Sequence, residues 1–110
     1  MHLTLCWRAG FVGDENYTVF THVIDHAGQM WAGQDNWPQA GEFPTSLWLA
    51  GEFVTDRYEL ALPSDIPPGE YRIEVGMYLL ETMERLPVLG KDAQIEGSSI
   101  VFPGFGIQAP

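Results

Sequence analysis

The side chains in this chain that could do chemistry are chiefly carboxylates, three histidines and four tryptophans. His22 stands in a strand-like run, His26 in a turn and His2 near the start, so they lack a metal-ligand spacing such as H-x-x-x-H. No G-x-S-x-G elbow accompanies His22, and the paired acids of a glycosidase would need a cleft that the sequence does not indicate. We therefore predict no catalytic residue and no metal site, with His22 as a structural histidine.

The better functional lead is aromatic. Trp31, Trp37 and Trp48 flank or occupy a long irregular segment, and Asp35 lies among them. Indoles stack on the apolar faces of sugar rings, while carboxylates hydrogen-bond sugar hydroxyls, so these four residues are a candidate glycan-binding site. The alternative, which we favour, is that the tryptophans fold back as a lid, because the open ends of sandwiches need such plugs.

The acidic character of the chain limits its partners. Fifteen acidic residues against five basic ones give a formal net charge of −10. Such a chain repels phosphate backbones, so we predict that it does not bind nucleic acid. The run Asp14-Glu15-Asn16 could offer oxygen ligands to calcium, but a polar turn is the favoured interpretation, and no cofactor is otherwise predicted.

Two side chains are expected to act as structural latches, meaning that their hydrogen bonds hold a loop in place. Asp56 falls on the apolar face of its strand, where a carboxylate without partners would cost several kcal/mol. We expect it to accept backbone N–H bonds or to pair with Arg72 or Arg57, and so to hold the long loop. Tyr71 follows the turn Pro67-Pro68-Gly69 and resembles the tyrosine corner of immunoglobulin-like sandwiches.

Short strands separated by turns must position these residues. Two-residue alternation of apolar side chains predicts the strands, and no segment of helical period is long enough to nucleate a helix. We predict an all-β antiparallel sandwich, immunoglobulin-like or of the jelly-roll kind seen in carbohydrate modules. The predicted strands are 2–8, 17–25, 29–34, 53–62, 71–79, 86–89 and 95–102, with a hairpin turn at 25–28, a long loop over 35–52 and a loose tail over 103–110.

The length of 110 residues favours one sandwich domain over 1–110. The single cysteine, Cys6, cannot form an internal disulfide and is expected to be a small buried hydrophobe. Trp7 alternates with leucines and is expected in the core. A strand predicted directly after Met1 suggests a domain excised from a longer protein, and the sequence shows neither a signal segment nor a membrane-spanning run.

The order and spacing of several motifs over roughly residues 3 to 90 resemble one family. The chain is similar to the soluble C-terminal β-domain of bacterial polytopic membrane glycosyltransferases of the protein-mannosyltransferase type. The motifs that carry the resemblance are YTVFTHVID over 17–25, FPTSLWLAGE over 43–52, the strand around Asp56 and Tyr58, and PPGEY over 67–71.

This resemblance implies a non-catalytic accessory domain that lies outside the cytoplasm as part of a cell-membrane protein. Any transferase chemistry would then reside in membrane segments absent from these residues. Its partners would be the parent membrane domain and a glycan or an acceptor protein. The alternative is a purely structural or protein-interaction sandwich without a small-molecule ligand, and exposure of Trp31, Trp37 and Trp48 would discriminate between the two.

Overall fold

The computed structural model describes residues 1–8, 10, 13–89 and 95–107. The chain folds as an antiparallel β-sandwich, which confirms the predicted fold class. Two short 3₁₀ helices, η1 (Pro38–Gly41) and η2 (Thr45–Leu47), lie in the long loop. The strands are β1 (His2–Arg8), β2 (Thr18–Asp25), β3 (Met30–Asn36), β4 (Phe53–Glu59), β5 (Gly69–Leu79), β6 (Glu84–Arg85), β7 (Val88–Leu89), β8 (Ile95–Gly97) and β9 (Ile100–Ile107).

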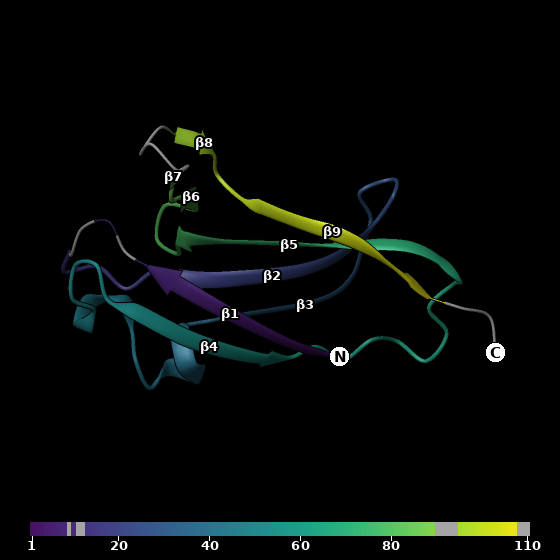
Figure 1. The fold of residues 1–110 in the computed structure, drawn as a ribbon, viewed down its shortest axis with the longest axis horizontal. Helices are drawn as coiled ribbons and strands as arrows, with labels where there is room; N and C mark the ends of the chain where they lie inside the picture. The colour runs from purple at the N-terminus through teal and green to yellow at the C-terminus, as the bar shows by residue number, and fades with distance from the viewer. Residues whose placement is uncertain (9, 11–12, 90–94, 108–110) are drawn as a thin grey trace.

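The larger sheet is built around β2 and β5. β2 pairs with β3 on one side and β5 on the other, while β6 and β9 pair with successive parts of β5 (Figure 1). The aromatic and β-branched residues on both faces of β2 are typical of a central strand that is covered on each side. Residues 18–21 are all buried, so both faces are indeed covered there.

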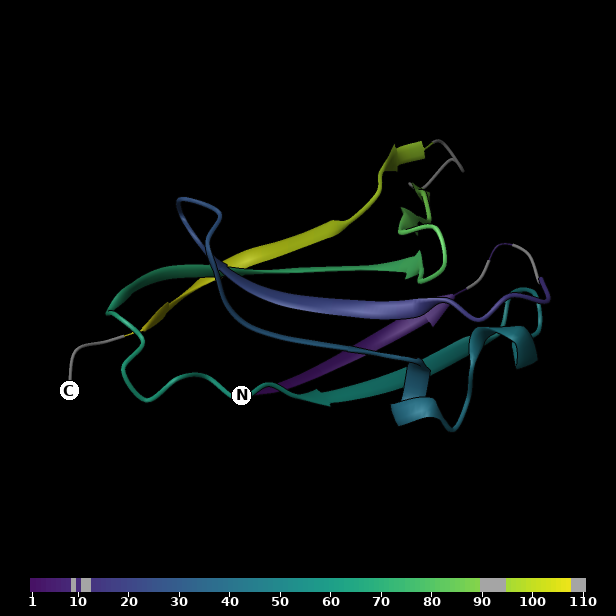
Figure 2. The same ribbon diagram turned by 180° about the vertical axis from the view of Figure 1, so that it is seen from behind.

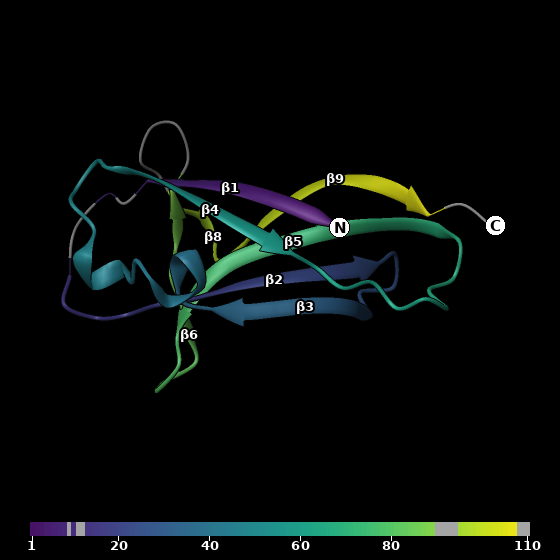
Figure 3. The same ribbon diagram turned by 90° about the horizontal axis from the view of Figure 1, so that it is seen from below.

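The smaller sheet consists of β1 and β4, paired so that Leu5 lies opposite Asp56. Figures 2 and 3 show this pair lying across one face of the larger sheet. Each fully buried aliphatic side chain between the sheets stabilises the fold by about 1.5–3 kcal/mol. The core consists of Trp48 and Leu60, which lie outside the strands, and of the inward-facing strand residues Leu5, Val19, Val23, Val54, Tyr58, Tyr71, Ile73, Val75 and Met77.

The hairpin between β2 and β3 is closed by Asp25. Its Oδ1 accepts the backbone N–H groups of Ala27 and Gln29, each at 2.9 Å. Gly28 has φ of 83°, a left-handed conformation in which a residue with a Cβ is strained. This is the turn that the Asp start and Gly finish predicted.

β5 begins with the hydrogen bond expected of a tyrosine corner. The Tyr71 hydroxyl donates to the Pro67 carbonyl oxygen at 2.6 Å, four residues upstream. The bond fixes the connection between β4 and β5 against the start of β5. Tyr71 itself is 3 % exposed, so its ring also fills the core.

Phe20 points to the outer face of the larger sheet but is only 1 % exposed. It packs against Gly76, where an added Cβ would lie 2.6 Å from the Phe20 Cζ. The Arg85 guanidinium lies over the Phe20 ring, with its central carbon 4.5 Å from the ring centroid. The missing side chain at Gly76 therefore makes room for an aromatic ring on this face.

The structure corrects the predicted tail over 103–110. Residues 103–107 belong to β9, in which Phe105 and Ile107 pair with Tyr71 and Gly69. A register shift between Tyr71 and Ile73 accommodates Pro103, which has no N–H for the ladder. Residues 108–110 lie outside the described residues.

Two further expectations are also wrong. The strand predicted over 95–102 is two strands, since β8 ends at Gly97 and β9 starts at Ile100. Cys6 is exposed, because the alternation that turns Leu5 and Trp7 inward turns Cys6 to the opposite face of β1.

Candidate functional site

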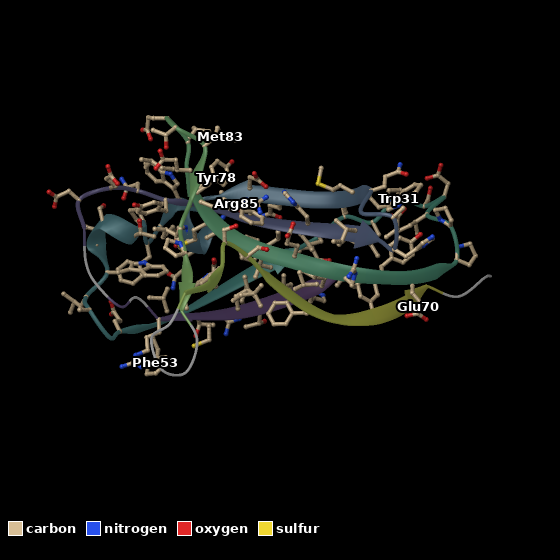
Figure 4. All side chains as sticks on the ribbon, turned by 90° about the horizontal axis from the view of Figure 1, so that it is seen from above. Trp31, Phe53, Glu70, Tyr78, Met83 and Arg85 are labelled. Atoms are coloured by element: carbon tan, nitrogen blue, oxygen red, sulfur yellow. The ribbon has the colours of Figure 1, made fainter. Side chains whose placement is uncertain are left out.

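The three tryptophans of the predicted glycan site do not present their rings together. Trp31 is near the start of β3 and Trp37 directly follows its end, so the strand separates them by about 20 Å. Trp48 is 4 % exposed and cannot offer a ring face to solvent, whereas Trp37 is 43 % exposed. Figure 4 places Trp31 at the end of the sheet away from Tyr78 and Arg85. These indoles therefore form no common platform.

Trp31 and Trp48 are instead anchored through their N–H groups. The Trp31 Nε1–H donates to Asp25 Oδ2 at 2.9 Å, and this bond is the largest cause of the lowered pKa of Asp25. The Trp48 Nε1–H donates to the Phe43 carbonyl oxygen at 2.9 Å, and the rings of Trp48 and Phe43 pack with centroids 6.4 Å apart. Trp48 thus occupies the lid position that was the favoured alternative.

Asp35, the fourth predicted ligand residue, lies in a polar cluster on the outer face of the larger sheet. Its Oδ2 accepts the Tyr78 hydroxyl at 2.8 Å, and its Oδ1 is 3.6 Å from His22 Nε2. Burial, followed by this hydrogen bond, raises the pKa of Tyr78. The His22 ring also packs against Phe20, with centroids 5.0 Å apart. His22 therefore has the partners expected of a structural histidine.

Asp56 joins three segments of the chain. Its Oδ2 accepts the Tyr58 hydroxyl at 2.5 Å and the Trp7 Nε1–H at 3.2 Å, while its Oδ1 accepts the Gln39 backbone N–H at 2.8 Å. Burial, followed by the bond to Asp56, raises the pKa of Tyr58 strongly. The carboxylate is fully buried, and its described partners are these neutral donors rather than the arginines considered from the sequence.

The loop that Asp56 holds is strained. Gln39 and Ala40 have φ of 55° and 54°, left-handed values that cost a residue with a Cβ roughly 1–2 kcal/mol. The Gln39 side chain adds a second tie to β4, since its Nε2 donates to the Thr55 carbonyl oxygen at 3.0 Å. These contacts fix the loop to β4 in a conformation that it would not adopt alone.

A cavity of about 340 Å³ lies at one end of the sandwich, which we call the loop end. There the segments 13–17 and 45–48 meet the end of β1 and the end of β5, and the N-terminus lies at the opposite end of β1 (Figure 1). Both sheets and the long loop contribute walls. The larger aromatic and aliphatic side chains among its described walls are Trp7, Tyr17, Trp48, Met77, Leu86 and Ile100.

Polar groups line the cavity on the side of Tyr17. The Tyr17 hydroxyl donates to Glu15 Oε2 at 3.1 Å, and the Thr45 hydroxyl donates to the Glu15 carbonyl oxygen at 2.8 Å. Thr45 Oγ1 also accepts the Tyr17 backbone N–H at 2.9 Å. Burial, followed by the hydrogen bond to Glu15, raises the pKa of Tyr17. This network fixes the aromatic ring and the carboxylate on one wall.

Sequence reasoning identified Trp48 but missed this cavity. Glu15 was assigned to a polar turn or a calcium site, and Tyr17 to a strand. The cavity forms only when segments far apart in the sequence meet, since the Glu15–Thr45 bond spans 30 residues. The aromatic residues at 7, 17 and 48 were the available signal, although their spacing in the sequence does not show that they meet.

The segment 14–16, for which calcium binding was the less favoured alternative to a polar turn, makes hydrogen bonds within the protein. Asn16 Oδ1 accepts the Ser46 backbone N–H at 3.1 Å, so Asn16 and Glu15 both tie residues 45–46 to the chain before β2. Among the residues that the structure describes, no three His, Cys, Asp or Glu side chains gather as a metal site would require. Within the same residues, no helix is long and apolar enough to cross a bilayer.

Comparisons of the chain with protein-family models, with curated proteins and with solved structures each found no match. The resemblance to the β-domain of membrane glycosyltransferases therefore stays a prediction from the sequence motifs. Structural support for a binding role comes from the geometry of the loop end.

Proposed function

We propose that this chain is a non-catalytic accessory domain of a membrane glycosyltransferase-like protein, that it lies outside the cytoplasm, and that it binds a glycan or an acceptor group in the loop-end cavity. The observation that carries the binding role is the cavity itself. Its volume of about 340 Å³ falls within the range of roughly 300–1,000 Å³ that is typical of ligand sites. The motif resemblance supports the parent protein and its membrane domain as a partner.

The position of the cavity supports recognition. Binding residues are often carried by loops that a rigid scaffold positions, as at the loop ends of immunoglobulin-like sandwiches. Here the scaffold fixes its loops through Asp56, which holds Gln39, and through Thr45, which bonds the segment before β2. A cavity held in this way is preorganised, so little ordering would oppose binding.

The non-catalytic part of the proposal is supported by where the chemistry-bearing residues lie. His22 packs on the outer face of the larger sheet against Phe20 and Asp35, away from the described cavity walls. At the cavity, the Tyr17 hydroxyl and the Glu15 carboxylate are bonded to each other. Their hydrogen bond gives Tyr17 and Glu15 a role in shaping the wall of a binding site.

The four indole N–H signals of the isotope-labelled domain test the proposal by NMR. We expect an oligosaccharide panel, with and without calcium, to cause saturable shifts at Trp7 and Trp48, which line the cavity. The signals of Trp31 and Trp37 serve as internal controls, because neither residue is among the described cavity walls. Shifts confined to Trp31 or Trp37 would contradict binding in the cavity.

A protein-interaction module is the second candidate, favoured by exposed apolar side chains around the loop end. Leu49 is 69 % and Phe53 70 % exposed. Figure 4 shows Phe53 and Met83 at the same end of the molecule. If this candidate holds, sugars at millimolar concentration leave all four indole signals unchanged, and L49S and F53S weaken association of the domain with the parent membrane part.

A further inference from the structure

We propose that the group entering the loop-end cavity is an organic cation, such as a quaternary ammonium or a protonated amino group. The inference rests on the proposed function and names the chemistry of the ligand at the same site. It is carried by one juxtaposition: three aromatic side chains from three segments, Trp7, Tyr17 and Trp48, line one cavity together with the carboxylate-bearing Glu15.

The hydrogen bonds already made by the wall favour a cation over an anion. The N–H of Trp7 is taken by Asp56, and the N–H of Trp48 by the Phe43 carbonyl oxygen. The half-buried Trp7 can therefore offer a guest only its carbon surface, and Trp48, which is 4 % exposed, offers only the small part of its carbon surface that reaches the cavity. The Tyr17 hydroxyl likewise donates to Glu15. Apart from Arg8 and the weak donor of Cys6, the side-chain donors of the described wall are thus engaged, while the Glu15 carboxylate keeps acceptor capacity.

Aromatic surface and negative charge act together on a cation. An ammonium group is attracted to the face of an aromatic ring, most strongly to the face of Trp. Glu15 supplies a full charge at the cavity, and the charges of Glu15 and Glu84 both contribute to the raised pKa of Tyr17. The net charge of −10 attracts cations from a longer range.

Arg8 is the basic residue among the described cavity walls. Its guanidinium centre lies over the ring of Phe53, 5.6 Å from the centroid. Phe53 is 70 % exposed, so this pair lies at the solvent-facing surface. The described wall therefore carries both charges: Arg8 is directed to an exposed aromatic ring, and Glu15, which is itself exposed, accepts the hydroxyl of Tyr17.

The test compares choline with its neutral isostere, in which carbon replaces the quaternary nitrogen. Shape and apolar area are nearly the same, so a difference in affinity reports the charge. We expect choline to shift the indole signals of Trp7 and Trp48 saturably, with an affinity at least about tenfold above that of the isostere. Glucosamine and glucose form a second matched pair, which shows whether a sugar can deliver the cation.

Glu15→Gln supplies the matched variant, since it keeps the size of the side chain and removes its charge. We expect choline affinity to fall about five- to tenfold, with that of the neutral isostere unchanged. Glu70→Gln makes the same change of net charge at the other end of the larger sheet (Figure 4), and we expect it to leave choline affinity within about twofold.

Equal affinity for choline and its isostere would overturn the cation inference and leave the cavity as a binding site. Binding of glucose as tight as that of glucosamine would do the same. If choline, isostere and oligosaccharides all leave the cavity indoles unshifted, the inference and the proposed function both fail. The comparison on the unmodified chain decides the question even if Glu15→Gln does not fold.

Discussion

Asp56 shows how a single carboxylate can organise this domain. Its hydrogen bonds reach Trp7 on β1, Tyr58 on β4 and Gln39 in the long loop. Removing the charge of Asp56 weakens all three hydrogen bonds. Because water cannot reach the site, the three donors would find no other acceptor. The latch role predicted from the sequence therefore depends on the charge of the buried group.

We expect Asp56→Asn to lower the free energy of unfolding by about 2–3 kcal/mol and the Tm by about 10 °C. The reason is the loss of three charge-assisted bonds together with the mismatch of an amide N–H₂ against N–H donors. Thermal unfolding followed by circular dichroism measures it. Asp14→Asn, at an exposed position, is the control and should leave the Tm nearly unchanged. If Asp56→Asn has the same Tm as the unmodified chain, Asp56 does not act as a latch.

The second prediction at the residue scale concerns the close packing of Phe20 against Gly76. An added Cβ would meet the Phe20 ring at 2.6 Å, so we expect Gly76→Ala to cost about 1–3 kcal/mol. A smaller loss in the Phe20→Leu background would show that the ring is the cause. Gly106→Ala is the control, because its Cβ would make only an ordinary contact at 3.5 Å. Equal losses for Gly76→Ala and Gly106→Ala in denaturant titrations would refute the packing argument.

The elements divide into those that the sequence predicts well and those that depend on tertiary contacts. Alternation located β1 at its observed bounds, and the Asp25 and Gly28 pattern predicted the hairpin. The last strand was missed over 103–107, because Pro and Gly resemble a tail until the register shift with β5 is known. The cavity was missed for a similar reason, since its walls include segments that lie 30 or more residues apart in the sequence.

The left-handed backbone of the long loop predicts opposite effects for two substitutions at neighbouring residues. We expect Ala40→Gly to raise the free energy of unfolding by about 0.5–1 kcal/mol, because glycine relieves the left-handed φ of 54°. Gly41 has φ of 90° and open space around it, so Gly41→Ala should cost about 1 kcal/mol through backbone strain alone. Urea unfolding measures both, and changes of the same sign would contradict the strain argument.

At the scale of the whole molecule, the tyrosines set an alkaline limit on stability. The pKa values of Tyr17, Tyr58, Tyr71 and Tyr78 are all raised, with burial as the largest cause in each. The folded state therefore keeps protons that the unfolded chain loses above a pH of about 10. The resulting stabilisation is fully present below that pH and is lost as the pH rises above it.

We accordingly expect the urea midpoint to be steady between about pH 8 and about pH 9.5 and to fall progressively at higher pH. Tyrosinate absorbance during the same titration should appear together with unfolding. Tyr58→Phe should flatten the fall, since the pKa of Tyr58 is raised most strongly by burial and by Asp56. A midpoint that stays constant through this range would show that the tyrosines are accessible in the folded protein.

The central claim is that the loop-end cavity is a binding site, and filling it tests the claim most directly. Gly13 lines the cavity, and nothing lies within 4 Å of where its Cβ would be, so Gly13→Leu adds a bulky side chain at the cavity wall without a clash at its Cβ. Gly106→Leu, outside the described cavity walls, is the control. With choline and the oligosaccharide panel as ligands, the account predicts saturable shifts of the Trp7 and Trp48 indole signals in the unmodified chain and in Gly106→Leu, and their loss in Gly13→Leu at unchanged Tm. Shifts that persist in Gly13→Leu, or that appear in none of the three proteins, would contradict it.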